Sequence, residues 1–132
     1  MASAQGERSG KVQKVAIQFI ADEVVTTAEH YRDVLVFKLL GYFADPPVYA
    51  MAARDVAEMH FGKAANAPQT SNRERQVGLG CDPYIWVNDL AALHEELSAK
   101  GAVIIEGPVT RIYGSIEITV SNCNGFLIVF GD

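Results

Sequence analysis

Side chains that could do chemistry stand on two short segments of this 132-residue sequence. VAEMHF alternates like a half-buried strand, so Glu58 and His60 are expected on the same face. In CDPYIW the same two-residue period places Asp82, Tyr84 and Trp86 together. A histidine can act as a general base near neutral pH, carboxylates can bind metal ions, and an indole ring can stack on a flat ligand or hold a cation over its face. These residues are therefore the first candidates for a functional site.

Each candidate also has a simpler structural interpretation. Glu58 could be a solvated acid at a sheet edge, because an ionised carboxylate is costly to bury without a partner. His60 could be half-buried and satisfied by a neighbour, and Trp86 could simply fill the core. Arg111 and Tyr113 precede a predicted strand, where either could clamp an anionic group, although a solvent-facing arginine is the simpler alternative. The sequence has no Ser/His/Asp set, P-loop or dinucleotide-binding glycine pattern that would favour another chemistry.

The elements that must position these residues occur twice in the same order. Apolar periodicity and turn residues predict one helix and four strands in each half. In the first half these are a strand at 14–21, a helix at 24–37 and strands at 38–43, 48–53 and 56–61. In the second they are a strand at 84–87, a helix at 90–100 and strands at 103–106, 115–120 and 126–130. This internal repeat is the most informative feature of the sequence.

Two of these elements carry particularly clear signals. In the first strand Gln18 is the lone polar residue of its face, which indicates that this face looks into something wetter than a helix-packed core. Before the second helix, Asn88 or Asp89 offers a side-chain oxygen to the free N–H groups of the first turn. Leucines at three- and four-residue spacing give that helix one apolar stripe.

Composition and charge argue against several classes of partner. A formal net charge of -5 argues against nucleic acid and anionic membranes. No run of 18 apolar residues could span a bilayer, and the first residues, MASAQGERSGK, lack the apolar region of a signal peptide. Cys81 and Cys123 show no CxxC spacing, which is typical of reduced thiols in a cytoplasmic protein. The expected organisation is a disordered tail at 1–12 and a single domain at 13–132, with module one at 13–62, a polar linker at 63–79 and module two at 80–132.

Three stretches carry a family resemblance that extends over roughly residues 14–132. They are YRDVLVFKL, VNDLAALHEELSAKGA and the closing GPVTRIYGSIEITVSNCNGFLIVFGD. In this order they resemble the vicinal oxygen chelate superfamily, which includes glyoxalases, extradiol dioxygenases, and fosfomycin- and bleomycin-resistance proteins. The resemblance implies an α+β fold of two βαβββ modules, whose mixed sheets form an open, curled barrel with the helices on the convex side. It also implies a homodimer. Val36 and Ser121–Gly125 depart from the glycine and Asp-Pro-Asp-Gly that the family often has there.

The same resemblance implies four metal-ligand positions, but this sequence does not fill them. They fall on Ala16, on Glu58 or His60 depending on the register of the fourth strand, on Asp82 and on Val129. Alanine and valine offer no ligating atom, and the divalent metals of such enzymes need several nitrogen or oxygen donors held together. We therefore expect no metal and no other cofactor, although a donor from a second subunit could complete a weak site.

The expected function is that of a metal-free, small-molecule-binding protein similar to the bleomycin-resistance group, which sequesters an aromatic or cationic compound in its cleft. The expected ligand-binding residues are Gln18, Glu58, His60, Asp82, Tyr84, Trp86, Arg111 and Tyr113, with His60 and Glu58 as the candidates for catalysis. The alternative is a metal-dependent glyoxalase- or dioxygenase-type lyase, isomerase or oxidoreductase with a non-standard ligand set. A third hypothesis is an interaction domain whose cleft is merely core. The sequence does not show whether the modules pair within one chain or between two.

Overall fold

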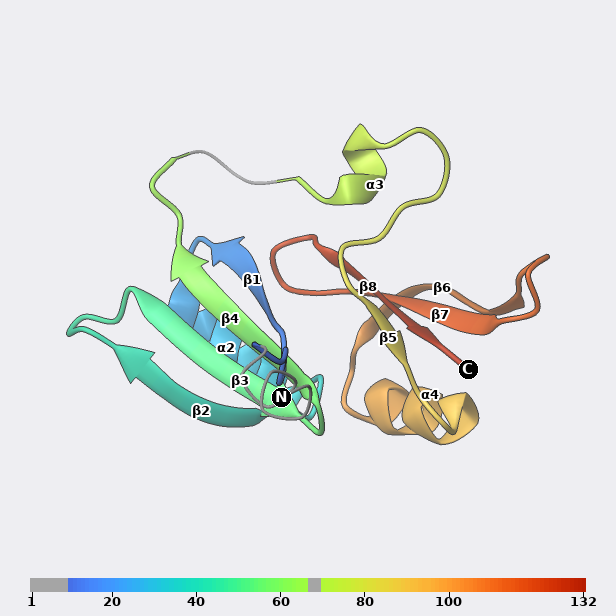
Figure 1. Cartoon of the computed structure of the whole chain (residues 1–132), viewed down its shortest axis with the longest axis horizontal. Coiled ribbons are helices and arrows are strands. Elements are labelled where there is room, and N and C mark those ends of the chain that lie inside the picture. Colours follow the sequence, from blue (N-terminus) through green and yellow to red (C-terminus); the bar gives the residue numbers. More distant parts are fainter. Residues whose placement is uncertain (1–9, 67–69) are drawn as a thin grey trace, which may run out of the picture.

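The computed structural model describes residues 10–66 and 70–132, which form two four-stranded mixed sheets (Figure 1). The first sheet has the order β1-β4-β3-β2, and the second has the order β5-β8-β7-β6. In each sheet the first strand runs parallel to the fourth and the remaining pairs are antiparallel. The α+β class and the repeated βαβββ order predicted from sequence are confirmed. The two sheets remain separate and, over the described ranges, form no closed barrel.

The element bounds follow the predicted order closely. The first module contains β1 (Ala16–Ala21), α2 (Val24–Asp33), β2 (Lys38–Phe43), β3 (Tyr49–Arg54) and β4 (Ala57–Lys63). The connection contains the short α3 (Asn72–Arg75). The second module contains β5 (Tyr84–Trp86), α4 (Leu90–Ala99), β6 (Val103–Thr110), β7 (Ile116–Ser121) and β8 (Leu127–Gly131). None of the helices in the described residues is long and apolar enough to cross a membrane.

Two predicted element boundaries need correction, and a third prediction lies mostly outside the described residues. The first helix ends at Asp33 rather than at residue 37, and Val36 then takes a left-handed conformation with φ 61°, which a helix cannot contain. β6 continues to Thr110 because the chain passes Gly107, at φ 97°, through a register shift against β7. The tail predicted at 1–12 falls mostly on residues 1–9, which lie outside the described residues.

The two modules share one apolar core on the helix-covered sides of their sheets. Phe19 of β1 and Phe126, just before β8, contact each other across the module boundary, with ring centroids 5.0 Å apart. Tyr31 of α2 is fully buried and packs on Phe61 of β4 at 4.6 Å. The Asn122 amide donates a hydrogen bond to the Tyr31 hydroxyl at 3.0 Å. The modules therefore meet through their helix faces, which leaves the opposite side of each sheet, here called its open face, directed elsewhere.

One strand is buried on both of its faces. Leu127 and Val129 of β8 point away from the core on the helix side, yet their exposed fractions are only 7% and 4%. The loop that carries Arg73 and Gly80 lies over this face and lines a small cavity together with Val129. β8 is therefore covered on both sides.

Candidate functional site

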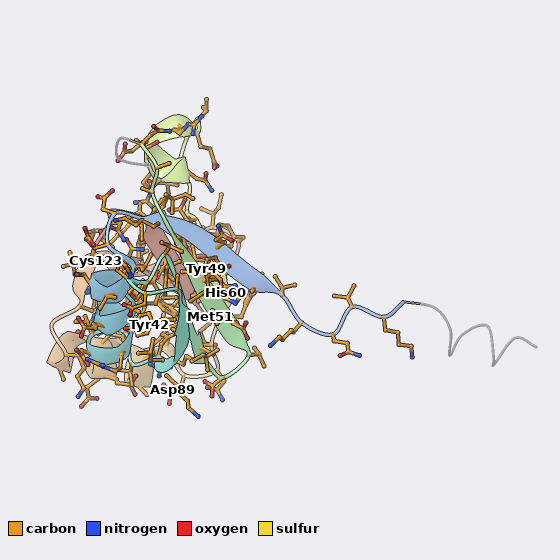
Figure 2. The ribbon with its side chains drawn as sticks, turned by 90° about the vertical axis from the view of Figure 1, so that its left-hand side faces the viewer. Tyr42, Tyr49, Met51, His60, Asp89 and Cys123 are labelled. Carbon is orange, nitrogen blue, oxygen red and sulfur yellow. The ribbon has the colours of Figure 1, made fainter. Side chains whose placement is uncertain are left out.

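The open face of the first sheet brings together residues from three strands. The strand register pairs Gln18 of β1 with His60 of β4, and His60 with Met51 of β3. Ala16 lies opposite Glu58 in the same parallel pair. Figure 2 shows Tyr49, Met51 and His60 on the side of the sheet away from α2. Both Glu58 and His60 therefore lie on this face, as the alternation of VAEMHF predicted.

A continuous chain of hydrogen bonds connects the polar side chains on this face. The Lys14 ammonium contacts Glu58 Oε1 at 2.8 Å, and Glu58 Oε2 lies 2.7 Å from His60 Nε2. His60 Nδ1 lies 2.8 Å from the Tyr49 hydroxyl, which donates to Gln18 Oε1 at 3.1 Å. We call Lys14, Gln18, Tyr49, Glu58 and His60 the sheet-one cluster.

The environment of Glu58 identifies it as a paired acid. Hydrogen bonds from Lys14 and then from His60 hold the pKa of the Glu58 carboxyl below its usual range. Its side chain is 15% exposed and that of His60 is 20% exposed. Of the alternatives raised from sequence, the solvated edge acid is wrong, and His60 is satisfied by neighbours on both ring nitrogens.

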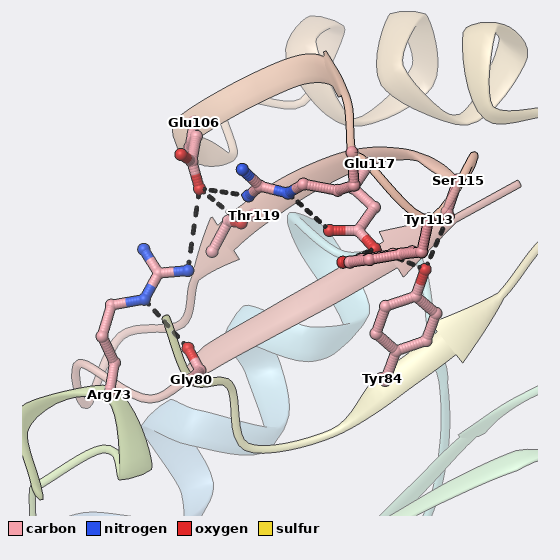
Figure 3. A network of polar contacts seen from close by, with 9 residues as sticks. Arg73, Gly80, Tyr84, Glu106, Tyr113, Ser115, Glu117 and Thr119 are labelled. Atoms are coloured by element: carbon pink, nitrogen blue, oxygen red, sulfur yellow. Dashed lines mark hydrogen bonds and ion pairs between the residues drawn. The ribbon is translucent and has the colours of Figure 1, made fainter. Parts of the chain in front are cut away.

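The open face of the second sheet carries a second polar network, shown in Figure 3. Glu117 of β7 is at its centre, with an exposed fraction of 2%. Its Oε2 accepts hydrogen bonds from the hydroxyls of Tyr84 at 2.7 Å and Tyr113 at 2.6 Å. Its Oε1 accepts from Arg111 Nε at 3.0 Å. The buried carboxylate thus has a partner for both oxygens, which is the condition for keeping such a charge buried.

Arg111 is shared between two acids. Its Nη2 donates to Glu106 Oε1 at 2.8 Å, and Arg73 approaches the same oxygen at 3.7 Å (Figure 3). Hydrogen bonds to Glu106 and Glu117 raise the pKa of the Arg111 guanidinium further. Arg111 is therefore neither solvent-facing nor free to clamp an anion. We call Arg73, Tyr84, Glu106, Arg111, Tyr113, Ser115 and Glu117 the sheet-two cluster.

Burial and hydrogen bonding act in opposite directions on the acid at the centre of this cluster. Burial alone would raise the pKa of Glu117, but the hydrogen bonds from Tyr113, Tyr84 and Arg111 outweigh it and lower that pKa. The pKa of the Tyr113 phenol is raised because it donates to Glu117. For Tyr84, burial raises the pKa and the bond to Glu117 adds to the effect. Both phenols therefore stay protonated and act as donors to a fixed charge.

Tyr84 and Trp86 lie side by side at the edge of the second sheet. Their ring centroids are 4.7 Å apart, and Trp86 is 78% exposed. The indole is therefore not part of the core of one chain, in contrast to the simpler interpretation raised from sequence. Gly131 of β8 makes room for this arrangement, because a methyl group there would overlap the Tyr84 hydroxyl.

Asp82, expected at a ligand or metal position, has a different role. Its Oδ1 accepts from the backbone N–H of Asn72 at 2.9 Å, and its Oδ2 accepts from the N–H of Leu127 at 2.7 Å. Both oxygens are thus used to hold α3 and the start of β8 against the chain before β5. Asp82 is a structural anchor for the loop over the second open face.

We expect Asp82→Ala to lower the free energy of unfolding by about 2 kcal/mol, because two backbone N–H groups lose a charged acceptor. Asp82→Asn, which keeps one acceptor oxygen, should cost less. Urea denaturation of both variants measures the difference. If Asp82→Ala has the same free energy of unfolding as the wild type, these two hydrogen bonds contribute nothing to stability.

The residues do not fit the metal site that the resemblance implies. Ala16 and Val129 have no donor atom, while Glu58 and Asp82 have both carboxylate oxygens engaged. Within residues 10–66 and 70–132, no group of three or more His, Cys, Asp and Glu side chains is arranged to hold a metal ion.

The two clusters do not meet within one chain. Across the described part of the chain, no hydrogen bond joins them, and of the two clusters only the sheet-two cluster lines the small cavity beside Val129. A cavity of about 490 Å³ lies between the β3–β4 turn and the start of α4 and contains residues of neither cluster. It is lined by Trp86, by apolar residues such as Phe37 and Leu93, and by the ion pair of Arg54 and Glu96. The single cleft expected from sequence is therefore present as two separate half-sites.

Several site residues were not predicted from sequence. These are Lys14, Tyr49, Arg73, Glu106, Ser115 and Glu117. Only Tyr49 had a usable signal, because it lies in the strand predicted at 48–53, two residues before Met51, and so shares its face. The others reach their clusters from turns, loops or strand pairings that a single sequence does not specify.

Comparison with known proteins agrees with this architecture. No protein-family model matches the sequence, and no curated protein matches it. Among solved structures, TioX from Micromonospora sp. ML1 superposes with a TM-score of 0.72 at 16% identity, covering 91% of this chain and 98% of TioX. A bleomycin-binding protein complexed with bleomycin gives 0.68 at 13% identity, covering 92% and 98%. A glyoxalase-related enzyme from Clostridium phytofermentans gives 0.67 at 14% identity, covering 94% and 97%.

These likenesses establish the fold. The chain has the fold of the bleomycin-resistance and glyoxalase-related proteins, which is the fold that the sequence resemblance to the vicinal oxygen chelate superfamily implied. At identities of 13–16% they leave the function to be argued from the half-sites themselves.

Proposed function

We propose that this chain is a metal-free protein that binds a small aromatic molecule in a cleft formed by two copies of the chain. In this arrangement the sheet-one cluster of one copy faces the sheet-two cluster of the other. The observation that carries the proposal is the separation of two partly open, polar and aromatic half-sites within one chain. The likeness to a bleomycin-binding protein in complex with its ligand supports small-molecule binding on this fold.

Exposed apolar side chains on both faces support the pairing. Phe43 of β2 lies opposite Tyr49 on the first open face and is 68% exposed. Trp86 and Tyr113, at the second open face, are 78% and 67% exposed. Large apolar groups gathered on an open face are typical of an interaction surface. A homodimer that brings the two faces together would cover both.

The charges of the two clusters narrow the class of ligand. Lys14 forms an ion pair with Glu58, and the arginines of the second cluster form ion pairs with Glu106 and Glu117. No unpaired cation among the cluster residues is left to hold an anion, while the exposed Trp86 can stack on a flat ring or accept a cation over its face. The proposed ligand is therefore a neutral or cationic aromatic compound. Two free cysteines support a reducing, cytoplasmic setting for its capture.

The first test is the mass of the protein in solution. Sedimentation equilibrium should give twice the chain mass of 14.3 kDa at micromolar concentration. A monomer at all concentrations would overturn the proposed cleft.

The second test concerns metal and ligand. Dialysis against a chelator should leave the melting temperature unchanged, and titration with neutral or cationic aromatic compounds should change the fluorescence of Trp86, the one tryptophan of the chain. Trp86→Phe should weaken binding of the same compounds, measured by calorimetry. Turnover of a substrate that depends on added metal would favour an enzyme and contradict the proposal.

A further inference from the structure

The Gln18 side chain is held in one orientation by the sheet-one cluster. Its Oε1 accepts the proton of the Tyr49 hydroxyl at 3.1 Å. Its Nε2 has no hydrogen-bond partner among the described residues, and Gln18 is exposed. The amide group therefore turns its oxygen toward the protein and its NH₂ toward the open face.

The hydrogen bonds of the sheet-one cluster show what fixes the orientation of the Gln18 amide. A tyrosine hydroxyl has one proton, and Tyr49 donates it to Gln18 Oε1. His60 Nδ1 lies 2.8 Å from the oxygen of the same hydroxyl, and His60 Nε2 lies 2.7 Å from a Glu58 carboxylate oxygen. The Tyr49 hydroxyl is therefore held between the imidazole ring and Gln18, and its proton is directed at Gln18 Oε1.

We infer that Gln18 is the specificity-determining residue of the first half-site and selects a ligand that carries a hydrogen-bond acceptor, such as a carbonyl, ether or heteroaromatic nitrogen, next to its aromatic ring. Glu58, His60 and Tyr49 are positioning residues that present the Gln18 NH₂ group. This inference rests on the proposed function, since it names the ligand class of that same cleft.

The first experiment needs no ligand. In ¹⁵N-labelled protein, NMR should show the Gln18 side-chain NH₂ protons open to exchange with water, because they face the open side of the sheet. In Tyr49→Phe, which removes the proton that Gln18 Oε1 accepts, the Gln18 NH₂ signals should shift. Gln18 NH₂ signals that are protected from exchange, or that do not respond to Tyr49→Phe, would overturn the inference.

The second experiment measures selectivity with a matched pair of proteins. Gln18→Glu keeps the shape of the side chain and the acceptor for Tyr49 but removes the donor. N,N-dimethylbenzamide, an aromatic probe that can only accept, should bind about five- to tenfold more weakly to this variant. Equal affinities for the two proteins would contradict the inference, whereas a failure of all aromatic probes to bind either would count against the proposed function and leave the NMR result to decide the role of Gln18.

Discussion

Replacing Glu117 with alanine is expected to lower the free energy of unfolding by about 3 kcal/mol, because removing one partner of a buried ion pair leaves the other without compensation. Arg111 would lose one of its two acids, and the hydroxyls of Tyr84 and Tyr113 would lose their shared acceptor. Glu117→Gln keeps an acceptor and should cost less. The exposed Glu95→Ala on α4 is the matched control and should stay within about 0.5 kcal/mol of the wild type.

Chemical denaturation at pH 7 measures these differences, and the pH dependence adds a second test. The folded-state pKa of Glu117 is lowered, so its contribution to stability is fully present above the usual range of a glutamate, near about 4.3. It is lost as the pH falls from there through the lowered folded-state value. The stability difference between wild type and Glu117→Gln should therefore shrink on acidification. A difference that stays constant down to the acid transition would show that the ionised carboxylate is not what matters.

Asn122→Ala is expected to lower the free energy of unfolding by a similar amount, about 2–3 kcal/mol. Asn122 is 5% exposed, and its Oδ1 accepts from the backbone N–H groups of Asn124 at 2.9 Å and Phe126 at 3.0 Å. Its Nδ2 donates to the Tyr31 hydroxyl. One side chain thus closes the turn before β8 and ties it to α2 of the other module. Truncation leaves the Tyr31 hydroxyl and the N–H of Phe126, both buried, and the half-buried N–H of Asn124 without these partners.

A double-mutant cycle separates the two roles of Asn122. Tyr31→Phe removes only the bond between the modules and should cost about 1 kcal/mol. In the double variant, Tyr31→Phe and Asn122→Ala should be less than additive, with a coupling of at least about 0.5 kcal/mol. Additive effects would mean that the turn is stabilised locally and that the bond to Tyr31 does not connect the modules.

The repeat of modules could be predicted because each element carries its own local signal. The two-residue period of VAEMHF placed Glu58 and His60 on one face, and β4 has them there. The leucine stripe of α4 is buried as expected, and Asp89 caps the helix by accepting from the N–H of Ala92. Such signals act over a few residues, so one sequence is enough to find them.

The partners within the site depend on pairings between distant strands. Tyr49 is 31 residues from Gln18, and Tyr84 is 33 residues from Glu117. Such contacts are set by strand register and by the loop over the second sheet, neither of which has a local signal. For the same reason the sequence did not show that two backbone N–H groups would occupy both carboxylate oxygens of Asp82. The separation of the two half-sites follows from how the modules pack, which the order of elements does not determine.

The measurement that tests the two-copy cleft most directly is photo-crosslinking from position 86. With p-benzoylphenylalanine in place of Trp86 and an equal mixture of ¹⁴N- and ¹⁵N-labelled chains, mass spectrometry distinguishes links within a chain from links between chains. The proposed cleft predicts a covalent dimer in which position 86 of one chain is joined to the open face of the first sheet of the other, around Met51. Links confined to one chain, or a dimer joined elsewhere, would contradict the proposed cleft.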